Sequence, residues 1–145
     1  MIDTKHFSKC IATLELSLKH LQSTKKTNPE YEVFRNATIK GFELTLEIAG
    51  KLLRKALKIY TSNPSSVDEL TYKDMFRHAA KHHLLSTEAT ERWFSYRDNR
   101  NYRDHDDGIA LAEEILKLFP HFIDDARSLE KKIGSLQFND FVPNL

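Results

Sequence analysis

The apolar residues near the start of the chain recur at the spacing of an α-helix. They lie alternately four and three residues apart, at Phe7, Ile11, Leu14, Leu18 and Leu21. Charged residues flank this stripe, so one side of the segment is suited to a core and the other to water. The pattern predicts an amphipathic helix from about Asp3, a good N-cap residue, to about Thr24.

A second and longer helix is predicted from Pro29 to about Tyr60. Asn28, Pro29 and Glu30 form a typical helix start, and apolar residues then follow at helical spacing. Gly41 and Gly50 lie inside this helix, where each costs about 1 kcal/mol relative to alanine. We interpret both glycines as sites where another helix approaches closely.

Three further helices complete the pattern. One is predicted over 71–83, opened by the capping pair Thr71 and Asp74, and another begins after Ser86 and Thr87. The last begins after residue 107 with a broad apolar face. Pro120 should kink it just after Phe119, because proline has no backbone N–H to donate.

These elements predict an all-α protein, an up-and-down bundle of four or five helices with a long closing helix kinked near Pro120. No segment shows the period-two alternation that is typical of strands. The length of 145 residues is that of a single domain. We place the domain at residues 1–134, with Gly134 as the C-cap of the last helix, and a tail at 135–145.

The composition limits the cell compartment in which the protein is expected and the classes of partner that it could bind. The 22 basic and 21 acidic residues leave a net charge of +1, which gives no global attraction for nucleic acid. Any contact with nucleic acid would therefore need a local cluster of cations. The single cysteine, Cys10, reads as a buried thiol and excludes an internal disulfide, and the first residues do not resemble a secretory signal. We expect a cytoplasmic protein that does not enter a membrane.

One stretch differs from the rest, because eight of the eleven residues at 97–107 are Arg, Asp or His. An arginine guanidinium matches the geometry of phosphate oxygens, and a histidine can take and give a proton near neutral pH. Together these groups suffice for RNA cleavage without a metal ion. Arg100 and His105 are five residues apart, about 140° around a regular helix, so they converge only if the helix breaks between them.

A structural interpretation of the same stretch remains open. Arg100 with Asp104, and Arg103 with Asp107, have the i,i+4 spacing of ion pairs on a solvated helix face. Composition alone favours this interpretation, since surface charge runs usually contribute little beyond solubility.

A family resemblance changes that balance. From about 34 to 129 the sequence resembles the HEPN domain and, more narrowly, the nucleotidyltransferase substrate-binding proteins, small all-helical chains that pair with minimal nucleotidyltransferases. The matching residues lie in the long helix, at the start of the next helix, before the charged stretch, within it and in the last helix: Phe42, Glu43, Glu47, Lys51, Thr71, Asp74, Trp93, Arg100, Asn101, His105, Ala112, Ile115, Phe119 and Pro120.

The resemblance implies a homodimer that brings two Arg/His sets to one cleft, in a two-component system of the toxin–antitoxin kind. It implies a metal-independent ribonuclease without a cofactor, in which Arg100 holds phosphate, His105 transfers the proton and Asn101 orients the substrate or His105. Arg97, Tyr102 and Arg103 are further candidates for binding RNA phosphate, and Glu43, Glu47 and Lys51 for contacting the nucleotidyltransferase. Many members carry a tyrosine where this chain has Asp107, which puts regulation by nucleotide transfer to that tyrosine in doubt.

Three alternatives stay open. The chain could be a non-catalytic adaptor that presents substrate to the nucleotidyltransferase, or a helical scaffold unrelated to nucleotides. Glu43, Glu47 and Lys51 also have the spacing of a simple salt-bridge ladder. His78 and His82 have the spacing of a helical metal pair, but no third ligand is evident, so we predict no metal site.

Overall fold

The structure is a computed structural model that describes residues 2–101 and 108–136. These residues form helices and connecting turns, with no strand among them. The elements in chain order are α1 (Lys5–Gln22), α2 (Glu30–Lys58), the 3₁₀ helix η1 (Pro64–Glu69), α3 (Tyr72–Lys81), α4 (Thr87–Asn101), α5 (Gly108–Leu116) and α6 (Phe119–Gly134). The predicted all-α bundle is confirmed.

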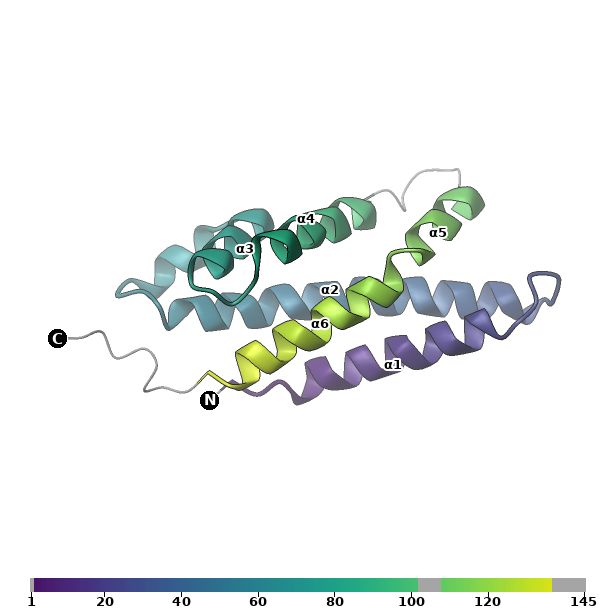
Figure 1. Cartoon of the computed structure of the whole chain (residues 1–145), viewed down its shortest axis with the longest axis horizontal. Coiled ribbons are helices and arrows are strands. Elements are labelled where there is room, and N and C mark those ends of the chain that lie inside the picture. Colours follow the sequence, from purple (N-terminus) through teal and green to yellow (C-terminus); the bar gives the residue numbers. More distant parts are fainter. Residues whose placement is uncertain (1, 102–107, 137–145) are drawn as a thin grey trace.

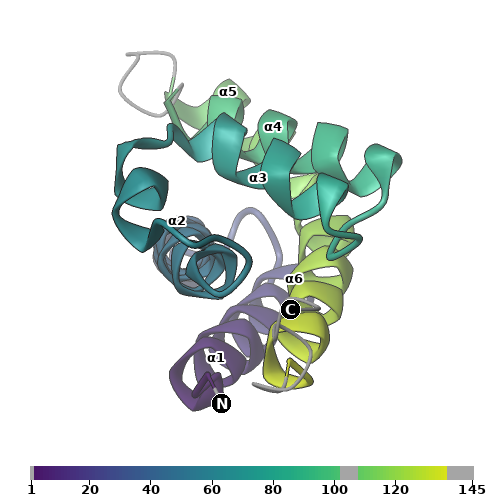
Figure 2. The same ribbon diagram turned by 90° about the vertical axis from the view of Figure 1, so that its left-hand side faces the viewer.

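The helices pack around α2, the longest of them. α1 runs back along α2, and α6 lies beside α1 and also contacts α2 (Figure 1). Viewed from the end, α3 and α4 lie together on the other side of α2 from α1 (Figure 2). α4 therefore lies far from α1, with one side towards α2 and α6.

The predicted stripe of the first helix forms one side of the core. All five of its apolar residues are buried: Phe7, Ile11, Leu14, Leu18 and Leu21. Both glycines of α2 lie at close approaches, as predicted. A Cβ atom on Gly41 would lie 3.4 Å from Leu14 Cδ1 of α1, and one on Gly50 would lie only 2.9 Å from Tyr72 Cε2 of α3.

Aromatic rings fill the centre, where α2, α3, α4 and α6 meet. The Phe42 ring of α2 lies 4.8 Å from the rings of Phe119 and Phe122 of α6. Trp93 of α4 is fully buried and stacks on Phe76 of α3 at 4.9 Å. Edge-to-face and offset pairs of this kind add to the stability that area burial alone provides. Trp93 is therefore a core residue.

The predicted closing helix is divided into two helices. α5 ends at Leu116 and α6 begins at Phe119, so the helix is interrupted before Phe119 and not just after it. The reason lies in Pro120, which cannot donate to the carbonyl of Leu116 four residues earlier and whose ring crowds that carbonyl. Pro120 instead occupies the first turn of α6, where an N–H has no helical partner to lose.

Helix ends follow local side-chain chemistry. Thr71 Oγ1 accepts a hydrogen bond from the backbone N–H of Asp74 at 3.1 Å, which confirms the predicted cap of α3. At the other end of α3, His83 adopts φ 63° and the Leu84 N–H donates to the carbonyl of Ala79, an arrangement that closes the helix. Gly134 is the last residue of α6 and not its C-cap, a position that Ser135 takes with φ −86°.

A membrane-spanning helix would need about 20 predominantly apolar residues. None of the helices in the described residues has both the length and the hydropathy to cross a membrane.

Candidate functional site

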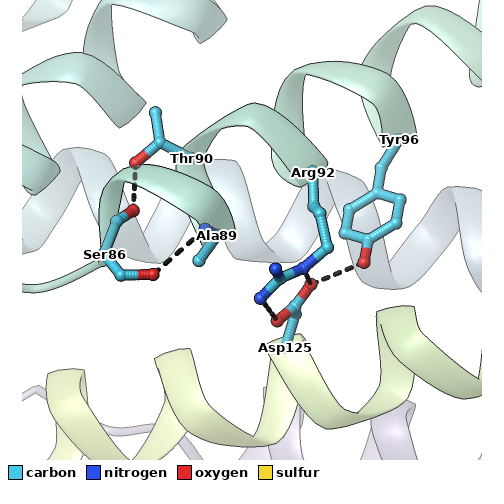
Figure 3. Close-up of polar contacts among 6 residues, drawn as sticks. All are labelled: Ser86, Ala89, Thr90, Arg92, Tyr96 and Asp125. Atoms are coloured by element: carbon cyan, nitrogen blue, oxygen red, sulfur yellow. Dashed lines mark hydrogen bonds and ion pairs between the residues drawn. The ribbon is translucent and has the colours of Figure 1, made fainter.

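α4 carries the first half of the charged stretch, and its start is fixed by Ser86. Ser86 Oγ accepts a hydrogen bond from the Ala89 N–H at 3.1 Å, and the Thr90 hydroxyl donates to the Ser86 carbonyl at 2.8 Å (Figure 3). These bonds satisfy groups that the first turn of a helix leaves without partners. The cap therefore sets where α4 begins.

A buried ion pair clamps the middle of α4 to α6. Arg92 donates from Nε and Nη2 to the two carboxylate oxygens of Asp125, each at 2.8 Å, and the Tyr96 hydroxyl donates to Asp125 Oδ2 at 2.5 Å (Figure 3). Asp125 is only 7% exposed, so its charge depends on these donors. Hydrogen bonding to Asp125 raises the pKa of Arg92, and burial followed by the same carboxylate raises the pKa of Tyr96.

The outer side of α4 faces α3. The Arg97 guanidinium lies over the Tyr72 ring, 5.2 Å from its centroid, and the Tyr72 hydroxyl donates to the Leu46 carbonyl at 3.3 Å. Burial raises the pKa of Tyr72, while the charges of Arg97 and Arg100 act to lower it. Both guanidinium groups are therefore near enough to Tyr72 to act on it electrostatically.

Arg97 and Arg100 differ from the other arginines of the described residues. Neither has a carboxylate or carbonyl partner there. The remaining five each bind oxygen: Arg35 to Glu32, Arg54 to two carbonyls, Arg77 to Asp74, Arg92 to Asp125 and Arg127 to Glu15. Within that part of the chain, Arg97 and Arg100 thus retain the donors that a phosphate group would use.

The structure describes only part of the rest of the predicted catalytic set. Asn101 is the last residue of α4, and its side chain lies outside the described part of the structure. Tyr102, Arg103 and His105 lie outside the described residues altogether, as does Asp107. α4 is described up to Asn101 and α5 from Gly108, so the break that the sequence predicts between Arg100 and His105 lies outside the described residues.

The three candidates for partner contact lie in two different environments. Glu47 and Lys51 form an i,i+4 ion pair at 3.5 Å with side chains 48% and 68% exposed, as expected for a ladder. Glu43 is only 6% exposed, so it does not share that open face. Among the three residues, Glu47 and Lys51 alone are available for contact with another protein as the chain stands.

The sequence interpretation missed the Arg92–Tyr96–Asp125 cluster. Arg92 and Tyr96 are four residues apart, and Asp125 interrupts the apolar spacing of Phe122, Ala126 and Leu129. A carboxylate in such a stripe signals a buried charge that needs a partner. That signal was present, but the partner could not be read from the sequence because it lies 33 residues away.

The histidine group near the end of α3 has a packing role. The His82 ring stacks on Tyr60, with centroids 4.2 Å apart. Burial, followed by the nearby charge of His78, lowers the pKa of His82. In the described ranges no set of three or more His, Cys, Asp or Glu side chains is placed to hold a metal ion.

A separate groove of about 560 Å³ opens near the α1–α2 turn and the start of α6, with a smaller one beside it. The Tyr31 hydroxyl donates to Glu113 Oε1 at 2.9 Å, and Lys26 lies 3.5 Å from the same carboxylate. The groups that line these grooves are thus largely paired with one another.

A family model matches most of the chain, and two solved structures are similar to it in fold. Residues 3–135 match the family model described as "Nucleotidyltransferase substrate binding protein like". The structure is similar to HI0074 from Haemophilus influenzae, which is described as having the fold of a substrate-binding domain of a nucleotidyltransferase. The TM-score is 0.81 at 18% identity, covering 92% of this chain and 100% of that one. A protein from Thermus thermophilus, ttk003001694, matches with a TM-score of 0.64 at 25% identity, over 88% of this chain and 98% of that one. No curated protein matches the chain significantly.

Proposed function

Because the chain belongs to the family of nucleotidyltransferase substrate-binding-like proteins, we propose that it pairs with a minimal nucleotidyltransferase and cleaves RNA without a metal ion when it is free. In this proposal the two proteins form a toxin–antitoxin-like system, and the helical chain acts as a homodimer. The resemblance of residues 34–129 to the HEPN domain supports the proposal, since that resemblance includes the Arg100-Asn101-x-x-x-His105 motif.

The observation that carries the proposal is the state of Arg97 and Arg100. They are the two arginines without an oxygen partner among the described residues, and both belong to the charged stretch that the sequence singled out. The other five arginines of the described residues are paired with oxygen, so these two neighbouring guanidinium groups are the ones whose N–H donors are free to bind a phosphate. Arg100 then holds the scissile phosphate and stabilises the charge that builds on it. His105 transfers the proton, and Asn101 orients the substrate or His105.

Arg103, Tyr102 and Arg97 extend phosphate binding beyond the scissile group in this proposal. Arg97 already has its guanidinium fixed over Tyr72, at 5.2 Å from the ring centroid. A cation held in place by packing loses less freedom when it binds phosphate than a free one does. Substrate binding would therefore follow the last two turns of α4 and continue into 102–107.

The direct test is RNA cleavage by the purified chain in the presence of EDTA. Chelator-resistant cleavage should fall by about 10²-fold or more in His105→Ala and in Arg100→Gln. Arg127→Gln is the matched control, because Arg127 is also an exposed arginine but lies on α6 and pairs with Glu15. Cleavage that survives in both motif variants, or that EDTA abolishes, would contradict the ribonuclease proposal.

A second function, that of a non-catalytic adaptor, is favoured by the outer face of α2. Val33 and Leu44 are 64% and 44% exposed there, unusual values for large apolar side chains, and Glu47 and Lys51 continue the same face. Leu44 lies one helical turn from Glu47, so this apolar side chain and the Glu47–Lys51 pair could contact the same partner protein. An inert wild-type chain that binds the nucleotidyltransferase, with binding weakened by Leu44→Glu, would support this function over catalysis.

A further inference from the structure

An aromatic ring and two cations form a surface cluster next to Arg97 and Arg100. The Phe94 ring of α4 lies 5.0 Å from Arg77 Cζ and 5.6 Å from Lys73 Nζ, both of α3. Phe94 is only partly buried, in contrast to the fully buried Trp93 before it. The Phe94 ring thus packs against the core on one side and has charged side chains on the other.

We propose that Arg77, supported by Phe94, is a stacking platform for a base of single-stranded RNA, with Lys73 at its side as a phosphate contact. This inference rests on the proposed function, in that RNA is the substrate. Arginine guanidinium planes stack on bases, and a base stacks equally on aromatic rings, so the platform would accept any sequence.

The Arg77 guanidinium is held from two sides. Asp74 Oδ1 accepts a hydrogen bond from Arg77 Nη1 at 2.7 Å, and Asp74 is itself fixed by its backbone bond to Thr71 at the start of α3. Phe94 lies against the guanidinium, while the Arg77 side chain remains 58% exposed. The guanidinium is therefore bound by Asp74 and lies 5.0 Å from the Phe94 ring, and the exposed part of the side chain remains accessible to a ligand.

The Phe94 ring of the platform lies on the same helix as Arg97 and Arg100, within two turns of both. Phe94 and Arg97 are three residues apart, so they share one side of α4. Phe94 and Arg100 are six residues apart, about 9 Å along the helix axis and about 120° around it, and Arg97 lies between them. Neighbouring nucleotides of one strand could therefore reach both the platform and Arg100.

The charge of this surface favours RNA over protein. Four cations, Lys73, Arg77, Arg97 and Arg100, lie near two carboxylates, Asp74 and Asp98, which pair with Arg77 and Lys73. Among the described residues, the surface therefore keeps a positive surplus in a chain whose net charge is only +1. The large apolar side chains that are exposed in the described residues, Leu16, Val33 and Leu44, lie on α1 and α2. A protein contact would be expected there.

The test is the affinity of the full chain for a short fluorescent single-stranded RNA, measured by anisotropy in the His105→Ala background to prevent cleavage. Phe94→Leu removes the support, and Arg77→Lys keeps the charge but removes the plane. Each should weaken binding about fivefold or more. Phe94→Tyr should retain binding, because it keeps the ring. Arg127→Lys is the matched control and should change the affinity by less than about twofold, since Arg127 lies on α6 and pairs with Glu15.

Unchanged affinity in folded Phe94→Leu and Arg77→Lys would overturn the inference, and so would a chain that binds no RNA. Loss of nucleotidyltransferase binding in these variants, with RNA binding intact, would show a protein contact and would also overturn it. The proposed ribonuclease fails separately: RNA that binds through Arg77 but is not cleaved when His105 is present contradicts that activity alone. Cleavage with RNA binding insensitive to Arg77 and Phe94 contradicts the platform alone.

Discussion

The two sides of α4 use the same residue type for opposite purposes. On the inner side, Arg92 gives two hydrogen bonds to Asp125 of α6, which is 7% exposed. On the outer side, Arg97 and Arg100 have no carboxylate or carbonyl partner among the described residues. Arg92 and Arg97 are only five residues apart, so neither composition nor helix propensity separates them.

The difference follows from the partner that each arginine has, and not from residue type or exposure, since all three arginines are partly buried. A buried carboxylate must be matched by fixed donors, or it would destabilise the fold, so Arg92 is committed to structure. A guanidinium on the outer side has solvent as its alternative partner and remains available for a ligand. The following predictions test this division, beginning with the largest expected effect.

Removing the buried charge should destabilise the protein strongly. Asp125→Asn keeps the shape of the side chain but leaves Arg92 without its counter-ion and weakens the acceptor for Tyr96. Because the partner charge then lies in a partly buried place, we expect the free energy of unfolding to fall by about 3 kcal/mol, measured by urea denaturation. The matched control is Glu15→Gln, which breaks the ion pair between Glu15 of α1 and Arg127 of α6. This pair is more exposed, with side-chain exposures of 39% for Glu15 and 42% for Arg127.

Glu15→Gln should cost less than about 1 kcal/mol, because exposed ion pairs contribute little. Equal losses in Asp125→Asn and Glu15→Gln would remove the distinction between the two kinds of ion pair, and with it the structural assignment of Arg92.

The outer side of α4 depends on packing beneath it, which Gly50 makes possible. In Gly50→Ala the new Cβ would meet Tyr72 Cε2 at 2.9 Å, so the ring under Arg97 has to move. We expect a loss of about 2 kcal/mol from overpacking, in spite of the better helix propensity of alanine. Gly41→Ala is the control, since its Cβ would lie at an acceptable 3.4 Å from Leu14 Cδ1.

Gly41→Ala should leave the free energy of unfolding unchanged or raise it by up to about 1 kcal/mol. If both alanine variants were equally stable, Tyr72 could not be the rigid support that we ascribe to it.

The inner cluster also predicts how stability changes at alkaline pH. Burial and the bond to Asp125 raise the pKa of Tyr96 above its ordinary value of 10.0, so the folded state favours the neutral phenol. This contribution to stability is complete below about pH 10 and is lost as pH rises towards the folded-state pKa, at up to about 1.4 kcal/mol per pH unit. In Tyr96→Phe, the free energy of unfolding should fall less steeply above about pH 10, by up to that amount per pH unit. Urea unfolding at several pH values measures this slope.

Tyr72 provides the internal reference for this experiment, because burial raises its pKa as well and it remains in the Tyr96→Phe variant. If the free energy of unfolding fell equally steeply above pH 10 in the wild type and in Tyr96→Phe, the pKa of Tyr96 would not differ between the folded and unfolded states.

Helix positions and the first core face could be predicted from the sequence, because both follow local spacing. Phe7, Ile11 and Leu14 repeat at the helical period, and Thr71 carries the oxygen that caps α3. The break before Phe119 was displaced from the prediction because the effect of Pro120 falls on the carbonyl four residues earlier. Such details follow from local chemistry once the helical hydrogen-bond pattern is applied.

Contacts between distant segments could not be predicted in the same way. Asp125 needed a partner, but several arginines could have supplied it, and only packing selects Arg92. Likewise, Phe94 and Trp93 look equivalent as adjacent aromatic residues, yet Trp93 points to the core and Phe94 lies under Arg77. The motif at Arg100 was recognisable from family resemblance. Only the structure shows that Arg97 and Arg100 lack oxygen partners within the described ranges, where the other arginines have them.

The smallest expected change in stability gives the closest comparison of the two sides of α4. Arg97→Gln removes a guanidinium whose described contact is the Tyr72 ring at 5.2 Å, so the free energy of unfolding should fall by only about 0.5 kcal/mol. Arg92→Gln removes the same group but leaves the Asp125 carboxylate buried with only Tyr96 as donor, and should cost about 2 kcal/mol. RNA affinity should show the reverse order, with Arg97→Gln binding more weakly than Arg92→Gln at equal salt, because the donors of Arg92 are already committed to Asp125. If the variants ranked in the same order in stability and in RNA affinity, the two arginines would differ in their partners but not in their roles.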